Sequence, residues 1–162
     1  GFVGNRMLHV ARRIAEFMVE EGALPWQVDK VLYDYGFPMG VFAVNDLAGV
    51  DIGVAIRKGQ RKLYEDRRHP VLMDKVALTN TGAHVLEEKL AIRGADIDVI
   101  WHYGYGYPRY RGGPMFHGDL AGLKSVYDTA VKLHKVYGDW MKPSALLKQL
   151  ADDGKKISEY VS

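Results

Sequence analysis

The chain has 162 residues, of which 48% are hydrophobic and 26% are charged. A chain of this size can bury roughly 70% of its unfolded surface, so we expect a folded, soluble protein and not a disordered or fibrous one. Its 22 basic and 20 acidic residues give a net charge of only +2 and are dispersed, which argues against nucleic acid as a partner. The lack of cysteine excludes disulfides, thiolate catalysis and cysteine metal sites.

The most apolar stretch, residues 40–56, is interrupted by Asn45, Asp46 and Asp51. It is far shorter than the ~20 apolar residues of a membrane-spanning helix, so we expect no membrane span. Residues 1–6 lack both an initiator methionine and the charged-then-apolar order of a signal peptide. We therefore expect the sequence to come from the middle of a longer protein.

The first half of the chain predicts three helices. Apolar residues recur at three- and four-residue steps over residues 3–21, as on one face of an amphipathic helix. Gly22 ends this helix, and Pro25 begins a second that we expect to reach Asp34. Residues 35–40 form a turn rich in glycine and proline.

A third helix is expected from about Phe42 to Lys62, and Gly49 or Gly53 could break it. The second half then repeats this order. We expect a long helix, a break at Gly94, a short helix, a loop rich in glycine and tyrosine, further helices from Pro114, and a last short helix before a polar tail. The long helix is expected over residues 71–90, the short helix over 96–102, the loop over 103–113 and the last short helix over 145–151.

Matching strings indicate a duplication. Tyr35-Gly36-Phe37-Pro38 matches Tyr105-Gly106-Tyr107-Pro108, Asp46-Leu47-Ala48-Gly49 recurs as Asp119-Leu120-Ala121-Gly122, and Asp29 matches Asp98, with a few extra residues around Arg109-Tyr110-Arg111. The sequence therefore predicts an all-α fold of two duplicated helical units packed against each other. The expected boundaries are 1–62 for the first unit, 63–70 for a short linker, 71–142 for the second unit and 143–162 for a C-terminal helix and tail.

The side chains that usually carry enzymatic chemistry form no recognisable site in this sequence. No histidine has a partner at metal-site spacing, and no serine lies in a Gly-x-Ser-x-Gly string. His102 and His117, which flank the glycine-rich loop, are the strongest histidine candidates. The Gly-x-Gly of residues 104–106 lacks the third glycine and the preceding strand of a dinucleotide site, so we expect neither a cofactor site nor a metal site here.

Five polar residues have expected structural roles. Asp96 and Asp98 open the short helix of the second half, where we expect N-terminal capping. Asp46 and Asp119 stand among apolar residues, so we expect each to make a buried hydrogen bond to loop backbone. Asn5 lies at the start of the first helix, where its amide could cap the helix or hold a substrate oxygen, and spacing alone favours capping.

Several strings together resemble a known family. Gly1-Phe2-Val3-Gly4-Asn5-Arg6-Met7 and Tyr35-Gly36-Phe37-Pro38-Met39-Gly40 resemble the start of the C-terminal helical region of 3-hydroxyacyl-CoA dehydrogenases. The second half resembles the second helical repeat of multifunctional fatty-acid oxidation enzymes, which join an enoyl-CoA hydratase/isomerase to the dehydrogenase. Its matching strings are Ala95-Asp96-Ile97-Asp98-Val99-Ile100, Gly104-Tyr105-Gly106-Tyr107-Pro108 and Gly112-Gly113-Pro114-Met115-Phe116.

The resemblance covers nearly the whole chain. It implies a 6-phosphogluconate-dehydrogenase C-terminal-like fold and the oxidation of (S)-3-hydroxyacyl-CoA to 3-oxoacyl-CoA in fatty-acid β-oxidation, with NAD as hydride acceptor. In the family a His-Glu dyad on a preceding Rossmann domain removes the hydroxyl proton, and neither the dyad nor the NAD fingerprint is in this chain. We therefore expect the helical substrate-side and assembly region of such an enzyme, inactive alone.

The partners implied are the 3-hydroxyacyl-CoA substrate and the Rossmann and hydratase domains, with NAD bound outside this chain. The compartment would be the cytoplasm in a bacterium or the peroxisome in a eukaryote. The alternative is a non-catalytic helical interaction or CoA-ester-binding module derived from that enzyme.

The resemblance also implies site residues. The family's asparagine in the Gly-Phe-x-x-Asn-Arg motif reaches the reacting oxygen and maps onto Asn5, which favours a catalytic role there. Phe37, Pro38, Met39, Gly40 and Phe42 would line the acyl side of the cleft. The second repeat resembles the dimer partner of single-function relatives, so we expect it to stabilise the first without an active site of its own.

The sequence departs from the family pattern at two places. Val41 stands where the family usually has proline. The connection between repeats, about eight residues after Lys62, is shorter than in the family and lacks its glycine-rich basic segment.

Overall fold

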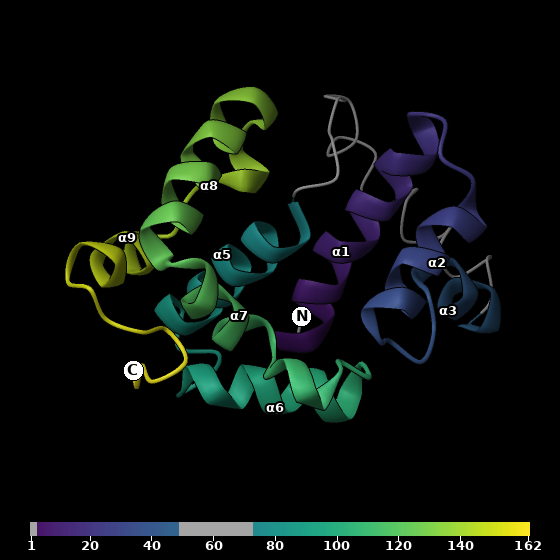
Figure 1. The fold of residues 1–162 in the computed structure, drawn as a ribbon. Helices are drawn as coiled ribbons and strands as arrows, with labels where there is room; N and C mark the ends of the chain where they lie inside the picture. Colours follow the sequence, from purple (N-terminus) through teal and green to yellow (C-terminus); the bar gives the residue numbers. More distant parts are fainter. Residues whose placement is uncertain (1–2, 49–72) are drawn as a thin grey trace.

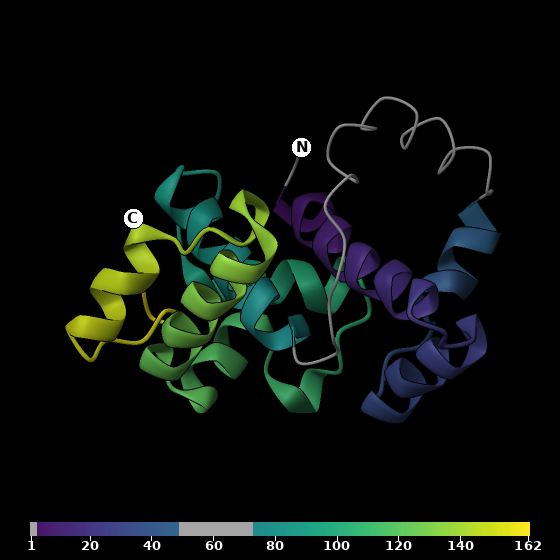
Figure 2. The ribbon, with the colours of Figure 1, turned by 90° about the horizontal axis from the view of Figure 1, so that it is seen from above.

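The computed structural model describes residues 3–48 and 73–162. Regular structure in these ranges is helical, and the β pairing there is limited to one isolated antiparallel bridge between Arg93 and Val161. Two groups of helices lie side by side, α1 to α3 in one and α5 to α9 in the other (Figures 1 and 2). The predicted all-α class is thus confirmed. None of the described helices is long and apolar enough to cross a membrane.

The first unit contains α1 (Val3–Glu20), α2 (Pro25–Tyr35) and α3 (Val41–Ala48). Pro25 occupies a first-turn position of α2, where its missing N–H costs nothing, as predicted. Gly36 ends α2 with a φ of 113°, a left-handed conformation that glycine adopts without strain. The expected extension of the third helix to Lys62, its break, the linker over residues 63–70 and the helix start at residue 71 lie outside the described residues.

The second unit contains α5 (Met73–Glu87), α6 (Gly94–Gly104), α7 (Pro114–Ala121), α8 (Leu123–Tyr137) and α9 (Ala145–Asp152), with short 3₁₀ turns at Arg109–Arg111 and Asp139–Met141. Gly94 was expected to end the long helix, and the next helix was expected to begin at Asp96. Both expectations are wrong, because α5 already ends at Glu87 and Gly94 is the first residue of α6. The carbonyl of Ile157 lies where a Cβ at this position would be, which explains the glycine.

Helix α5 is at the centre of the molecule. It packs against α1 of the first unit and against α7, α8 and α9 of its own unit. Accordingly its residues 77–80 are all buried, and the polar ones among them are bonded: Thr79 Oγ1 donates to the Pro114 carbonyl, and Asn80 Nδ2 donates to the Lys142 carbonyl at 3.0 Å. One hydrophobic core, which includes Met7 and Leu86, runs through both units.

A buried carboxylate caps a helix in each unit, at matching positions. Asp29 on α2 accepts hydrogen bonds from the N–H groups of Phe42 and Ala43 at the start of α3, both at 2.9 Å. Asp98 on α6 accepts from Met115 and Phe116 at the start of α7, at 2.7 and 3.1 Å. The same contact at both matching aspartates supports the duplication.

The two carboxylates need room at the helix they cap. Gly40 and Gly113 precede α3 and α7, and a Cβ at either position would overlap the aspartate side chain. Asp98 therefore caps the following helix, which corrects the expectation that it would cap its own. Asp96 does cap its own helix, since its Oδ2 accepts from the Arg93 N–H at 3.2 Å.

The repeated Asp-Leu-Ala-Gly strings behave differently in the two units. Asp119 accepts hydrogen bonds from the N–H groups of Ile157 and Ser158 at 2.8 and 3.0 Å, as predicted. Asp46 is exposed, so the buried hydrogen bond expected in the first copy is wrong. The difference arises because the C-terminal segment after α9 folds back over Asp119.

The buried cap predicts a pH-dependent stability. Burial raises the pKa of Asp98 to about 6, although the two N–H donors lower it in part. Because the folded-state pKa lies above the unfolded one, the folded state binds more protons between about pH 4 and pH 6. The free energy of unfolding should therefore fall by about 3 kcal/mol as pH rises through this range and stay level above it.

Urea unfolding of the wild type and of Asp98→Asn between pH 4 and pH 7 would measure this effect. The asparagine does not titrate, so the difference between the two proteins isolates Asp98. A ¹³C carboxyl titration of Asp98 should give a midpoint near pH 6. A midpoint below pH 4 would mean that the N–H donors outweigh burial.

Candidate functional site

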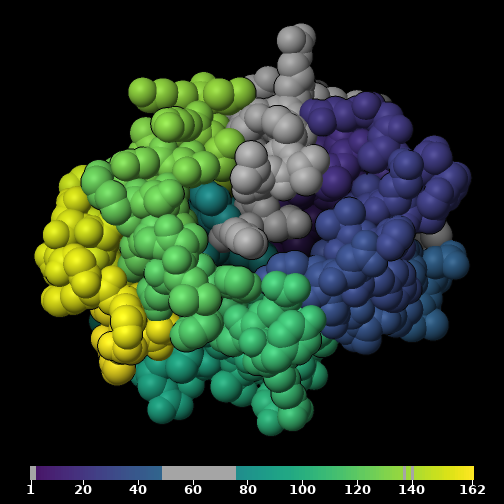
Figure 3. Space-filling model, in the orientation of Figure 1, coloured from purple at the N-terminus to yellow at the C-terminus, as the bar shows by residue number. Residues whose placement is uncertain are grey.

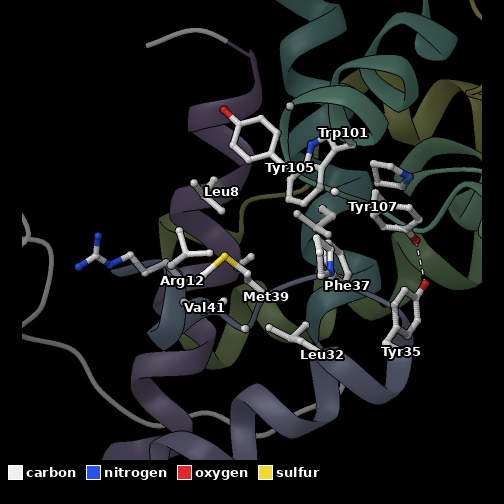
Figure 4. A pocket seen from close by; sticks show the side chains of 18 of the residues that line it. Leu8, Arg12, Leu32, Tyr35, Phe37, Met39, Val41, Trp101, Tyr105 and Tyr107 are labelled. Atoms are coloured by element: carbon white, nitrogen blue, oxygen red, sulfur yellow. Dashed lines mark hydrogen bonds between the residues drawn. The ribbon is translucent and has the colours of Figure 1, made fainter. Parts of the chain in front are cut away.

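An apolar cavity of about 760 Å³ lies between the two units. Its walls come from α1, α2, α3 and the turn between α2 and α3 on one side, and from α5, α6, the loop after α6 and α7 on the other (Figure 4). Figure 3 shows the first unit in purple and blue beside the second in green and yellow. The cavity is therefore a product of how the units face each other. Side chains on its walls include Leu8, Leu32, Phe37, Met39, Trp101 and Tyr107.

Four of the five residues expected on the acyl side of the cleft line this cavity: Phe37, Pro38, Met39 and Gly40. They belong to the turn between α2 and α3, whose course is fixed by Gly36 at one end and by the Asp29 cap at the other. Phe42 is half-buried, is not among the residues that line the cavity, and donates its N–H to Asp29.

Asn5 lies in the first turn of α1 and is exposed. It is the third described residue of the helix and so does not occupy the N-cap position. Its Oδ1 accepts a hydrogen bond from the Tyr105 hydroxyl at 2.7 Å. Because the Tyr105 residue also lines the cavity, this tyrosine connects the predicted catalytic asparagine with the predicted acyl site.

Aromatic side chains of the second unit, which sequence reasoning missed, form a wall of the cavity. Tyr107 is almost fully buried, and its hydroxyl shares a 2.8 Å hydrogen bond with that of Tyr35. Its ring also meets Phe37 edge-on at 5.4 Å. Burial, and then the bond to Tyr35, raise the pKa of Tyr107, so the hydroxyl stays protonated. The duplication could have predicted this wall, because units that pack face to face bring their matching loops together.

The extra residues of the second unit hold the first unit in place. The guanidinium of Arg111 lies over the Tyr35 ring at 4.0 Å, and its Nε donates to the Tyr35 carbonyl at 2.8 Å. The Tyr110 hydroxyl donates to the same carbonyl at 3.1 Å. The same hydroxyl lies so close to Gly36 that a Cβ at this position would clash with it.

The described residues do not fit a dinucleotide. They contain no β-strand, and the Gly-x-Gly of residues 104–106 lies at the C-terminal end of α6. That end carries the negative pole of the helix dipole, which repels a pyrophosphate. Nor do these residues contain a group of three His, Cys, Asp or Glu that could hold a metal ion.

Comparison with known proteins tests the resemblance. The family described as 3-hydroxyacyl-CoA dehydrogenase, C-terminal domain, matches residues 1–83 and then again residues 75–159. This chain belongs to that family. Two matches of one domain in tandem also confirm the duplication.

The matching relatives are multifunctional enzymes. The peroxisomal bifunctional enzyme of Danio rerio is 32% identical over 228 residues, covering 95% of this chain and 32% of the relative. That of Homo sapiens is 29% identical with the same coverage, and a glyoxysomal fatty acid beta-oxidation multifunctional protein of Brassica napus is 28% identical over 98% of this chain and 30% of the relative. The chain thus spans about a third of these relatives.

The matched stretch of 228 residues exceeds the 162 residues of the whole chain. The relatives therefore contain residues in this region that have no counterpart here.

Removal of the Tyr35 hydroxyl should weaken the contact between the units. Tyr35→Phe leaves the buried Tyr107 hydroxyl without this partner, so we expect a loss of about 1 kcal/mol in the free energy of unfolding. Tyr33→Phe is the matched control, because Tyr33 is 49% exposed and should give almost no change. Equal stability of the two variants in urea would show that the hydroxyl pair contributes nothing.

Proposed function

We propose that this chain is the helical substrate-side and assembly region of an NAD-dependent (S)-3-hydroxyacyl-CoA dehydrogenase of fatty-acid β-oxidation. Membership of the C-terminal domain family carries the proposal. The nucleotide and the proton-abstracting dyad would be held by a Rossmann domain outside this chain, so the chain alone would not turn over substrate. The resemblance to multifunctional fatty-acid oxidation enzymes adds a hydratase domain as a second partner. The compartment would be the peroxisome in a eukaryote, by analogy with the peroxisomal relatives, or the cytoplasm in a bacterium.

The cavity would hold the acyl chain of the substrate. Its walls are mostly aliphatic and aromatic, and they include Phe37, Pro38, Met39 and Gly40. Burial of each methylene group contributes about 0.8 kcal/mol, so an apolar cavity of this size favours a long acyl chain over a short one.

Asn5 would act on the reacting oxygen. Its Oδ1 is bonded to Tyr105, and its exposed position leaves the Nδ2 amide able to donate to a group outside the described chain. A fixed donor aimed at an oxygen that gains negative charge stabilises the transition state more than the ground state. The base that removes the hydroxyl proton would come from the Rossmann domain.

The decisive experiment is an NADH assay with (S)-3-hydroxyacyl-CoA. The chain alone should give no turnover. A chimera in which this chain replaces the corresponding helical region of the Danio rerio enzyme should be active, and Asn5→Ala should lower its kcat by about 10²- to 10³-fold, because an oriented donor to the developing charge is lost. Turnover by the isolated chain, or full activity of Asn5→Ala, would contradict the proposal.

The control in this assay is Gln149→Ala, which removes an amide from an exposed position of α9. It should leave kcat unchanged. If the chimera has no dehydrogenase activity while the chain binds acyl-CoA, the alternative of a non-catalytic CoA-ester-binding module is favoured.

The acyl site can be tested on the chain itself. Met39→Trp should fill part of the cavity and weaken the binding of palmitoyl-CoA at least about tenfold, since the displaced acyl methylenes each contribute about 0.8 kcal/mol. Leu47→Trp is the matched control, because Leu47 lies on α3, is 77% exposed and does not line the cavity.

Isothermal titration calorimetry with palmitoyl-CoA and with free CoA would measure both variants. Equal palmitoyl-CoA affinity of Met39→Trp and Leu47→Trp would place the acyl chain elsewhere.

A further inference from the structure

The first turn of α1 is held by residues of the second unit. Trp101, near the end of α6, is 2% exposed and donates its indole N–H to the Met7 sulfur at 3.2 Å. Arg6 forms a bidentate ion pair with Glu88, which follows α5. The Tyr105 hydroxyl donates to Asn5. Three successive residues of α1 are thus bonded to the other unit.

Gly4 allows the third of these contacts. A Cβ at this position would overlap the Tyr105 ring, so the glycine lets the ring lie directly against the backbone of α1. The ring also packs on Trp101, with the ring centroids 5.2 Å apart. In Figure 4 the Tyr105 ring lies beside Leu8 and Trp101, and its hydroxyl points away from Phe37 and Tyr35. Contacts with Gly4 and Trp101 thus hold the ring in place, and the ring in turn places its hydroxyl beside Asn5.

We propose that Tyr105 is a positioning residue for the catalytic amide of Asn5. An asparagine side chain on an exposed helix face rotates broadly about its last torsion, so its amide has no fixed direction. A hydrogen bond from Tyr105 to Oδ1 selects one orientation, which leaves Nδ2 to donate to the reacting oxygen. This inference rests on the proposed role of Asn5.

The protonation state of Tyr105 suits this role. Burial raises the pKa of the Tyr105 hydroxyl, so it remains a donor at physiological pH. A tyrosine hydroxyl that donates can bond only the oxygen of the amide, not its nitrogen. The second unit would then contribute directly to the site, although the sequence predicted that it only supports the first unit.

A purely structural role makes a different prediction. If Tyr105 only packs α1 against α6, its ring is sufficient and the hydroxyl is dispensable. Tyr105→Phe keeps the ring over Gly4 and Trp101 and removes only the hydroxyl, so this variant separates the two roles.

The test is a double-mutant cycle in the chimera with the Danio rerio enzyme, comprising the parent, Tyr105→Phe, Asn5→Ala and the double variant. Tyr105→Phe should lower kcat about tenfold, with KM and the unfolding midpoint unchanged, because only the preorganisation of the amide is lost. In the double variant, loss of the hydroxyl should have no further effect beyond that of Asn5→Ala.

Two controls separate the hydroxyl from general anchoring. Tyr103→Phe removes a hydroxyl from a 74% exposed tyrosine in the last turn of α6, two residues before Tyr105, and should leave kcat unchanged. Glu88→Gln breaks the neighbouring ion pair with Arg6, which is part-exposed and contributes little. If Glu88→Gln lowers kcat as much as Tyr105→Phe does, the effect is anchoring of α1 and the proposal is overturned.

The outcomes distinguish this inference from the proposed function. Full activity of Tyr105→Phe, or additive effects in the double variant, would overturn the positioning role while a low kcat of Asn5→Ala upholds the proposed function. Full activity of Asn5→Ala, or a chimera without turnover, would contradict both.

An NMR measurement on the chain itself provides an independent readout. The Asn5 side-chain amide signal, assigned by its loss in Asn5→Ala, should shift in Tyr105→Phe and not in Tyr103→Phe. An unchanged Asn5 amide signal in Tyr105→Phe would show that the hydrogen bond is absent in solution and would overturn the proposal.

Discussion

The contact between α1 and α5 is the interaction on which the rest of the structure depends. Helix α1 has a single apolar stripe, while α5 is surrounded by packed neighbours over most of its length. A stripe of this kind needs a partner surface, and the described helices α1 to α3 are too few to bury it well alone. Once α1 lies on α5, the loop after α2 faces the loop after α6, and the cavity forms between them.

The paired carboxylate caps explain how the loops keep their shape around the cavity. Asp29 and Asp98 each bind two backbone N–H groups of the next helix, so α3 and α7 begin at fixed places relative to α2 and α6. The neighbouring Gly40 and Gly113 are required for this contact. Gly40 also lines the cavity, so the residue that makes room for the Asp29 cap belongs to the wall of the proposed acyl site as well.

Much of the fold was predictable, because it is encoded locally. The spacing of apolar residues predicted α1, and Pro25 predicted the start of α2. The turn expected over residues 35–40 put the end of α2 at Asp34, where the structure has Tyr35, and the repeated strings predicted the duplication. The contacts that build the site were not predictable in this way. The bond between Tyr105 and Asn5 joins residues 100 positions apart in the sequence, and it depends on how the units dock. Likewise Asp98 was expected to cap its own helix. It caps α7 instead, and this contact could not be read from the sequence because α7 begins 16 residues after Asp98 and is adjacent to it only in space.

The unequal loops explain why a duplicated chain would have one site and not two. Tyr35 and Tyr105 are matching residues, yet Tyr35 bonds Tyr107 across the interface whereas Tyr105 bonds Asn5. The insertion in the second unit accounts for the difference, because Arg111 lies over the Tyr35 ring and bonds its carbonyl, which holds that loop against the second unit. No such insertion follows Tyr35, and Tyr105 instead packs beside Gly4 on α1. A few added residues thus make the two matching loops unequal. The loop at Tyr35 is held as a wall of the cavity, and the loop at Tyr105 contacts the predicted catalytic amide of Asn5.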